Sequence, residues 1–316
     1  EMCIRDRSWY LANTFNQTFD PQISVSSGYT TIYLQTGYVR NTGLELSLGY
    51  GHTWNNNFRW DSNFTLSHNK NKIKELVRDY VHPETGELIN KDRLDVGGLG
   101  KARFILKEGG TLGDLYTQSD LKRDDNGMVD IDPTGIVAIE NNLPDIKLGS
   151  VFPKANLAWS NHFSWKGISL SALFTARIGG IVYSATEAAM DQYGVSERSA
   201  LARDNGGVLV NNRTLVDAQN YYTTIGSESG LPQYYTYNAT NVRLQEASIG
   251  YLIPRKWLGN VCDIQVSVIG RNLWMIYNKA PFDPESVATT DNYYQGIDYF
   301  MLPSTRNIGF NVKINF

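Results

Sequence analysis

The sequence predicts an all-β fold whose strands cross a membrane as part of an antiparallel β-barrel. The first observation is that apolar and polar residues alternate near the end of the chain, within Ser304–Phe316. The apolar positions there are Ile308, Phe310, Val312, Ile314 and Phe316. The second is that similar segments recur upstream, separated by connections that are alternately short and long. The third is that aromatic residues gather at strand ends beside the short connections. A period of two gives a strand one apolar and one polar face, and outer-membrane barrels turn the apolar face to lipid.

Composition narrows the classes of function. The chain has 316 residues, a net charge of −3 and two cysteines, Cys3 and Cys262. It contains no run of 18 apolar residues, which excludes a helical membrane span, and the charge gives no support to nucleic-acid binding. No signal peptide opens the chain, and E-M-C-I-R-D-R fits no strand pattern. We therefore predict that residues 1–7 are a non-native leader and that residues 8–316 are a fragment of a longer protein.

The first half of the chain contains one clear hairpin. Thr42–Thr53 and Asn57–His68 both alternate, and a tight turn at 54–56 joins them. A weaker strand is expected at Ser8–Thr18, followed by a loop over 19–41. After a charged loop at 69–99, we expect Lys101–Lys107 and Thr111–Ser119 as two more barrel strands, joined at 108–110. Residues 120–154 read as another long loop.

The second half repeats the rhythm. Alternation predicts strands at Ala155–Trp165 and 168–177 around a short Lys166–Gly167 turn, and at Asn241–Ile253 and Val261–Leu273 around a turn at 254–260. The longest loop, 180–240, has short helices predicted near 185–190 and 200–202. A last loop covers 274–303. This gives about ten strands with five long loops on one side, whereas loops longer than about 15 residues are uncommon in compact soluble domains.

Several motifs in this order resemble the SusC/RagA family of TonB-dependent outer-membrane proteins. They are N-T-G-L-E-L-S at 41–47, K-E-G-G-T-L-G-D-L-Y at 107–116, the segment from Gly149-Ser150-Val151-Phe152-Pro153 to the strand before Lys166-Gly167, N-V-R-L-Q-E-A-S-I-G-Y-L-I-P at 241–254, G-R-N-L-W at 270–274, D-P-E at 283–285 and the terminal strand. The resemblance implies the C-terminal part of a 22-stranded barrel in the bacterial outer membrane.

The resemblance also implies a function and partners. Its members import glycans or peptides together with a SusD-like surface lipoprotein in Bacteroidetes-like bacteria. The TonB complex would act through the missing N-terminal region, which also holds the plug. The barrel-assembly machinery would insert the barrel, and the terminal aromatic residue Phe316 is the expected assembly signal.

Two groups of residues are candidates for sites. Charged residues on the polar face should line a wet lumen and pair with one another or with the plug. These are Glu45, Arg59, Asp61, Arg177, Asp263 and Arg271. Tyrosines cluster in the two last long loops, where rigid amphipathic rings bind ligands or partners, or else pack loop against loop. These are Tyr221, Tyr222, Tyr234, Tyr235, Tyr237, Tyr293 and Tyr294, with Tyr299 beside them.

No residue pattern predicts a metal, a cofactor or catalysis. The acidic segment 124–132 has the look of a calcium loop, but Lys122 and Pro133 occupy the first and twelfth ligand positions. We predict a solvated loop there and no enzymatic activity. Two alternatives stay open from the sequence: a secreted β-sandwich that binds polysaccharide, and a β-rich glycoside hydrolase whose carboxylate pair no motif singles out.

Overall fold

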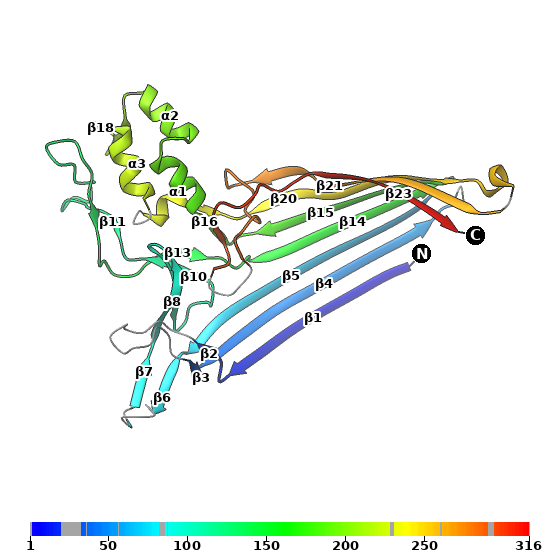
Figure 1. The fold of residues 1–316 in the computed structure, drawn as a ribbon. Coiled ribbons are helices and arrows are strands. Elements are labelled where there is room, and N and C mark those ends of the chain that lie inside the picture. The colour runs from blue at the N-terminus through cyan, green and yellow to red at the C-terminus, as the bar shows by residue number, and fades with distance from the viewer. Residues whose placement is uncertain are drawn as a thin grey trace.

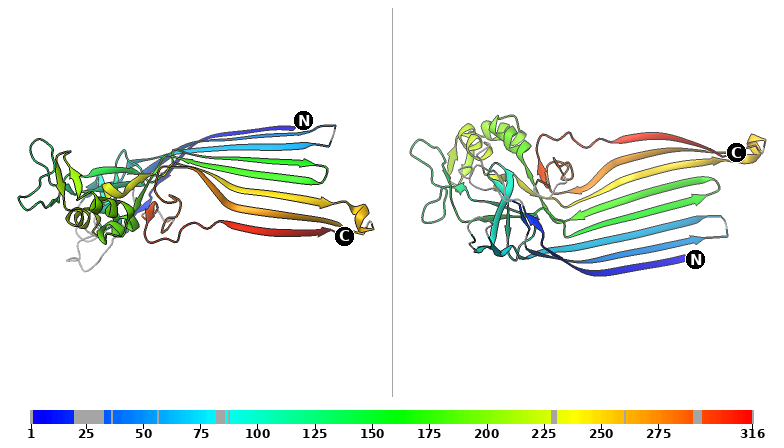
Figure 2. Two further views of the ribbon diagram at one scale, coloured as in Figure 1. Left: turned by 90° about the horizontal axis from the view of Figure 1, so that it is seen from above. Right: turned by 60° about the horizontal axis from the view of Figure 1, so that its bottom comes forward.

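A computed structural model describes residues 2–19, 33–35, 37–55, 57–81, 86, 88–227, 231–259, 261–289 and 294–315. Its largest element is a curved eight-stranded sheet, shown in Figure 1 and from two other directions in Figure 2. The strands, in their order across the sheet, are β1 (Met2–Phe15), β4 (Tyr38–Thr53), β5 (Arg59–Glu75), β14 (Ala155–Trp165), β15 (Ile168–Ile178), β20 (Asn241–Ile253), β21 (Asp263–Asn278) and β23 (Asn307–Asn315). Every neighbouring pair is antiparallel. β1 and β23 are the two edges, as expected for part of a barrel.

The connections differ at the two ends of this sheet. At one end they cover only 54–58, 166–167 and 254–262, and at the other they cover 16–37, 76–154, 179–240 and 279–306. Lys166 and Gly167 have φ of 47° and 88°, the left-handed conformations that a two-residue type I′ hairpin turn requires. The long connections gather at the far end into an outer domain (Figure 1). This asymmetry is the one predicted.

The sheet has one apolar face that no other sheet covers within the part of the chain that the structure describes. Residues directly opposite each other on neighbouring strands share a face, and the register places Leu170, Ile249, Val268 and Phe310 in one row. Leu170 is 47% exposed, Val268 44% and Phe310 70%. The other described sheets lie at the outer end (Figures 1 and 2). The outward apolar face is thus confirmed, and a β-sandwich is excluded.

Aromatic side chains form a continuous cluster at the short-turn end of that face. Trp54 lies 5.3 Å from Phe58, and Trp60 lies 5.5 Å from Tyr50 and 6.0 Å from Phe163, between ring centroids. Amphipathic rings of this kind mark the membrane–water interface in outer-membrane barrels.

Tryptophans also satisfy polar groups on the apolar face. The indole N–H of Trp60 donates to Asn161 Oδ1 at 3.1 Å, and that of Trp159 donates to Ser62 Oγ at 3.0 Å. An unsatisfied polar group in hydrocarbon costs several kcal/mol, so these bonds make the two polar residues tolerable there.

The outer domain contains the remaining strands. A four-stranded sheet joins β8 (Arg93–Leu99), β9 (Ala102–Lys107), β10 (Asp114–Thr117) and β13 (Ile146–Ser150). A three-stranded sheet joins β16 (Ile181–Ser184), β19 (Thr236–Asn238) and β22 (Ile297–Asp298). Two-stranded pairs are β2 (Thr18–Phe19) with β3 (Leu34–Gln35), β6 (Val77–Val81) with β7 (Leu88–Lys91), β11 (Asp120–Leu121) with β12 (Ile139–Glu140), and β17 (Val208–Val210) with β18 (Thr214–Val216).

Helices lie in the loop predicted to hold them. α1 (Ala185–Gln192), α2 (Glu197–Asp204) and α3 (Ala218–Gly226) each begin after a side-chain cap, namely Ser184, Ser196 and Asp217. Each cap accepts a backbone N–H of the first turn. Two 3₁₀ turns occupy Pro232–Tyr235 and Arg255–Leu258. No helix in the described ranges is long and apolar enough to cross a membrane.

Among the described residues, a buried core of the soluble type occurs in the outer domain alone. Phe104, Leu106, Leu115 and Tyr235 have no exposed surface there, and Ile73 at the end of β5 joins them. The large sheet carries its apolar residues on its surface instead. The fold therefore combines a membrane-type sheet with a soluble-type outer domain.

Two predicted barrel strands belong to this outer domain. β9 and β10 pair with β8 and β13, not with the large sheet, which has eight strands. The 108–110 turn between them docks on β5, because Ile73 N–H donates to Gly110 O at 2.9 Å and Gly109 N–H donates to Ile73 O at 2.8 Å. Periodicity alone could not show this, since it reports the faces of a strand and not its neighbours.

Strand ends differ from the predictions as well. β4 begins at Tyr38 and β5 continues to Glu75, so residues predicted as loop extend the hairpin outward. Met2–Arg7 pair with β4, although their sequence shows no strand pattern.

Candidate functional site

The polar face of the large sheet carries two grooves. The outer groove, of ≈730 Å³, is lined from several strands and from one loop residue, Glu285. Its polar lining includes Ser8, Glu45, Ser47, Thr65, Ser67, Asn156, Thr175, Arg177 and Gln245. The second groove, of ≈790 Å³, lies toward the short turns and includes Arg59, Asp61, His162, Ser171 and Glu246. Hydroxyl, amide and charged groups therefore coat this face.

The predicted lumen charges lie on this face, and most have a partner. Arg59 and Asp61 form a two-bond pair at 2.7 and 2.9 Å. Arg271 Nε donates to Glu246 Oε2 at 2.8 Å, and Asp263 lies 3.8 Å from Arg255. These pairs are largely exposed to water, so each contributes little to stability. Arg59, Asp61, Asp263 and Arg271 thus each have an oppositely charged partner on the large sheet or on its short turn at 254–262.

Arg177 and Glu45 differ from those pairs. Arg177 Nη2 donates to the Val151 carbonyl at 2.7 Å, while its buried Nε has no hydrogen-bond partner. Glu45 lines the outer groove with Arg177 and Glu285. The groove therefore holds charges of both signs within one polar wall.

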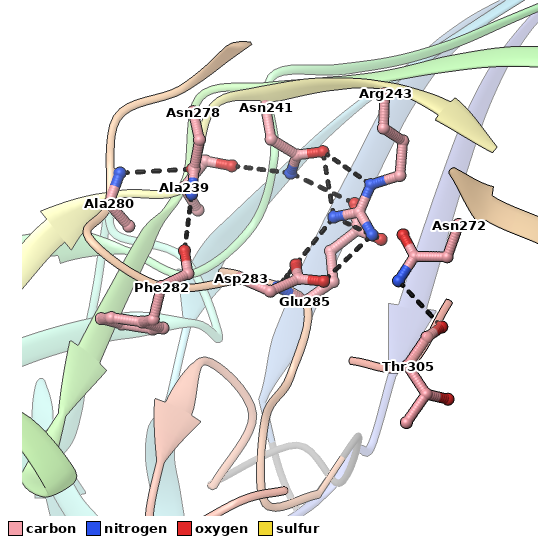
Figure 3. A network of polar contacts seen from close by, with 10 residues as sticks. All are labelled: Ala239, Asn241, Arg243, Asn272, Asn278, Ala280, Phe282, Asp283, Glu285 and Thr305. Atoms are coloured by element: carbon pink, nitrogen blue, oxygen red, sulfur yellow. Dashed lines mark hydrogen bonds and ion pairs between the residues drawn. The ribbon is translucent and has the colours of Figure 1, made fainter. Parts of the chain in front are cut away.

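A buried ion-pair network fixes the loop above this groove (Figure 3). Arg243 on β20 donates to both carboxylate oxygens of Asp283, at 2.7 and 3.1 Å, and lies 3.4 Å from Glu285. Asn241 accepts from Arg243 at 3.2 and 3.3 Å and donates to Glu285 Oε1 at 3.2 Å. The side chains of Arg243 and Asp283 are only 5% and 11% exposed. Burial raises the pKa of Asp283, but the bonds from Arg243, from the backbone N–H of Glu285 and from Ser304 outweigh it and leave the pKa below its ordinary value.

The sequence did not predict this network of Asn241, Arg243, Asp283 and Glu285, which we call the Arg243 clamp. Asn241, Arg243, Asp283 and Glu285 lie in two of the motifs that carry the family resemblance, 241–254 and 283–285, about forty residues apart. Their contact depends on the 279–289 loop folding back over β20 on the polar face. The one signal available in the sequence was Arg243 itself, an arginine within a strand whose residues otherwise alternate between apolar and polar.

The tyrosine cluster packs mostly inward. Tyr235 is fully buried, and its hydroxyl donates to Asp191 Oδ2 at 2.9 Å. Burial raises its pKa above the ordinary value, and the Asp191 carboxylate raises it further. Tyr222 is 9% exposed, and Tyr221 packs against its ring at 5.5 Å. Burial raises the pKa of Tyr221 to about 12.

The remaining tyrosines are more accessible. Tyr234 and Tyr237 are half-buried, Tyr294 is 42% exposed and Tyr299 53%. Tyr235 offers no contact surface, so loop packing accounts for it and largely for Tyr222. A ligand or partner role for the more accessible rings stays a prediction. Tyr293 and Phe316 lie outside the described residues.

Asp145 is the hub of a second ion cluster, in the outer domain. It accepts from Arg93 at 2.7 and 3.0 Å, from Lys107 at 2.9 Å and from Gln118 at 2.9 Å. Its side chain is 6% exposed. The hydrogen bonds from Arg93 hold the pKa of Asp145 well below its ordinary range, despite the opposing effect of burial.

Asp124 and Asp130 in the acidic segment already have donors nearby. Asp124 Oδ1 accepts the N–H groups of Asn126 and Met128, both at 2.9 Å. Lys122 donates to Asp130 at 2.7 Å, so a lysine ammonium already neutralises that carboxylate. No group of three His, Cys, Asp or Glu suited to a metal occurs among the described residues.

The comparisons with known proteins agree with this geometry. No family model matches the chain. TonB-dependent receptor P3 of Formosa agariphila is 25% identical over 96% of this chain and 32% of that protein. TonB-dependent receptor P26 of the same organism is 24% identical over 98% of this chain and 32% of that protein. The chain thus spans about a third of the length of these relatives.

Solved structures share the fold. The RagAB peptide transporter matches 99% of this chain and 33% of its own, with a TM-score of 0.71 and 18% identity. The RagAB peptide importer in its "closed-closed" state gives a TM-score of 0.68 with 19% identity. The fold is therefore that of a part of a large outer-membrane β-barrel with an outer domain built from its long loops. Within that class the chain is SusC/RagA-like and similar to TonB-dependent receptors, which confirms the resemblance seen in the motifs.

Proposed function

We propose that this chain forms part of the wall and outer mouth of a channel for TonB-dependent import across the outer membrane. The main support is the combination of a lipid-type apolar face with a polar inner face, whose outer groove lies beneath a loop clamped by Arg243. The similarity to named TonB-dependent receptors supports the proposal that TonB supplies the energy for import. The TonB complex would engage a part of the longer receptor that lies outside this chain, and the plug would belong to that part.

The cargo that we propose is an oligosaccharide or a peptide. The groove lining presents hydroxyl, amide and charged groups, which suit either a glycan or a peptide backbone. The likeness to a peptide transporter supports the second. A SusD-like surface lipoprotein is the proposed partner at the outer mouth, and the accessible Tyr294 and Tyr299 are candidate contacts for it. The named relatives are receptors and transporters, and we propose no enzymatic role.

The test uses the full-length receptor in its own bacterium. Removal of the receptor should stop depletion of one class of cargo from a medium that contains mixed oligosaccharides and mixed peptides, measured by mass spectrometry. Removal of TonB should give the same defect, which separates active import from passive leakage. Affinity purification of the receptor should recover a surface lipoprotein. Unchanged depletion of every oligosaccharide and peptide would refute the import proposal.

We also propose that residues 1–7 are foreign to the strand that they extend. The register places Arg5 opposite Leu48 and Arg7 opposite Leu46, on the apolar face. Arginine on the lipid face costs about 2–4 kcal/mol near the bilayer midplane. Mass spectrometry of the mature receptor from outer membranes tests this proposal, which fails if those seven residues are present in that place.

A further inference from the structure

Above the apolar band, the outward face of β4 and β5 becomes basic. On β4 this face runs from Leu46 and Leu44 through Thr42 to Arg40, and on β5 from Leu66 through His68 and Lys70 to Lys72. Lys74 follows beside a register irregularity, and Lys70, Lys72 and Lys74 are all exposed. We call Arg40, Lys70, Lys72 and Lys74 the basic ladder.

The position of the ladder along the strands is defined by its neighbours. On the side of the short turns, it adjoins exposed apolar residues such as Leu44 and Trp9, which are opposite each other. On the other side, Val39 and Ile73 enter the core of the outer domain. The ladder therefore lies between the apolar band and the outer domain, at the height of the outer-leaflet headgroups. Phe15 and Tyr38, stacked at 4.7 Å, lie at the same level, as expected for an interface belt.

The positive charges of the ladder repel one another. Arg40 is directly opposite Lys72, and like charges directly opposite across strands are destabilising. Arg40 Nε donates a hydrogen bond to Asn13 Oδ1 at 3.0 Å, and Arg40 Nη2 donates one to the Tyr38 hydroxyl. Both partners are neutral. The nearest acid along β5 is Glu75, and the structure records no ion pair between a described carboxylate and any of the four cations. Arg78 further out differs, because Glu108 neutralises it at 3.1 Å.

From this arrangement we propose that the basic ladder binds the phosphate groups of a phosphorylated glycolipid in the outer leaflet. An anion bound at this height attracts both Arg40 and Lys72 and so offsets the repulsion between them. Arginine and lysine clusters beside a membrane recognise anionic headgroups in this way, and a guanidinium suits phosphate oxygens in particular. The apolar band directly below accommodates the acyl chains. The proposal depends on the outer-membrane location of the barrel and not on what it imports.

The experiment measures lipid binding to the full-length receptor in detergent. Native mass spectrometry gives the apparent Kd for bis-phosphorylated lipid A and for the same lipid after removal of its phosphates. At about fivefold per lysine near a charged surface, the double variant Lys70→Gln/Lys72→Gln should bind the phosphorylated lipid about 25-fold more weakly. The control Lys91→Gln/Lys256→Gln removes two exposed lysines elsewhere and should stay within about twofold of the unaltered receptor. Lys72→Arg should bind normally.

Several results would overturn the proposal. These are equal affinity for the dephosphorylated lipid, equal loss in the control variant, a change below about twofold in the double variant, or loss of binding in Lys72→Arg. Inorganic phosphate that binds as tightly as the lipid would overturn the choice of a lipid. A purely structural role is distinguished by heat resistance on gels without lipid. Heat resistance should be unchanged or slightly raised in the double variant, because the substitution removes a like-charge pair. A clear drop in heat resistance would contradict the proposal.

Discussion

The Arg243 clamp makes the sharpest prediction about the outer mouth. In Arg243→Gln the Asp283 carboxylate, only 11% exposed, loses the cation that donates two hydrogen bonds to it. Removing one partner of a buried pair costs about 3–5 kcal/mol. The 279–289 loop can reduce this cost by opening and hydrating Asp283. We therefore expect a loss near the lower limit, about 3 kcal/mol, and confined to the opening of this loop.

Hydrogen exchange of the loop amides measures this effect. The N–H groups of Glu285 and Ser286 donate to Asp283, and that of Ala288 donates to Ile297 O at 2.9 Å. A loss of about 3 kcal/mol corresponds to about 150-fold faster exchange at these amides, while the amides paired between β20 and β21 should be unaffected. The matched control is Arg271→Gln, which breaks a pair exposed by 67% and 36% and should cost at most about 1 kcal/mol.

Two results would refute this reasoning. One is exchange accelerated by less than about tenfold in Arg243→Gln, which would mean that the clamp does not hold the loop. The other is equal acceleration in the Arg271 control, which would mean that burial does not matter to the pair.

Three further predictions concern the faces, the outer domain and assembly. Phe174→Arg, in the middle of β15 on the apolar face, should destabilise the inserted barrel by about 2–4 kcal/mol and Thr175→Arg on the polar face by much less, as judged by urea unfolding in lipid vesicles; equal losses would contradict the assignment of faces. Asp145→Asn should destabilise the outer domain at neutral pH. Because Arg93 lowers the pKa of Asp145 in the folded state, the loss of stability relative to the unaltered protein should be complete above about pH 4 and shrink as pH falls below that value. A difference in melting temperature that does not depend on pH would count against this role of Asp145. Phe316→Asp in the full-length receptor should lower the amount inserted in the outer membrane but leave heat resistance near normal, since a charge at the interface costs only about 0–1 kcal/mol; normal surface abundance would remove the assembly role.

The sequence alone determined the membrane sheet, because alternation is a local property. Val266, Val268, Phe310 and Val312 follow a period of two, and that period fixes which side chains share a face whatever the neighbours are. Six strands of the large sheet were located to within a few residues, and the short turns between them follow from local turn chemistry, as at Lys166–Gly167. Short helices were also expected near 185–190 and 200–202, where α1 and α2 lie, whereas α3 was not. The motifs added the family resemblance.

Only the tertiary structure decided what the long connections do. β9 has the strand pattern of a barrel element, yet it is buried on both sides in the outer domain, where the adjacent residues Phe104 and Ile105, on opposite faces of the strand, have no exposed surface. Arg243 meets Asp283 because the loop folds back over β20, and the cations of β4 and β5 meet because the register sets Arg40 opposite Lys72. Strand periodicity is set by bonds between adjacent residues, and the sequence carries it directly. Contacts between segments far apart depend on chain paths that close at a loop-entropy cost and are selected by the whole packed structure, which is why no local pattern showed them.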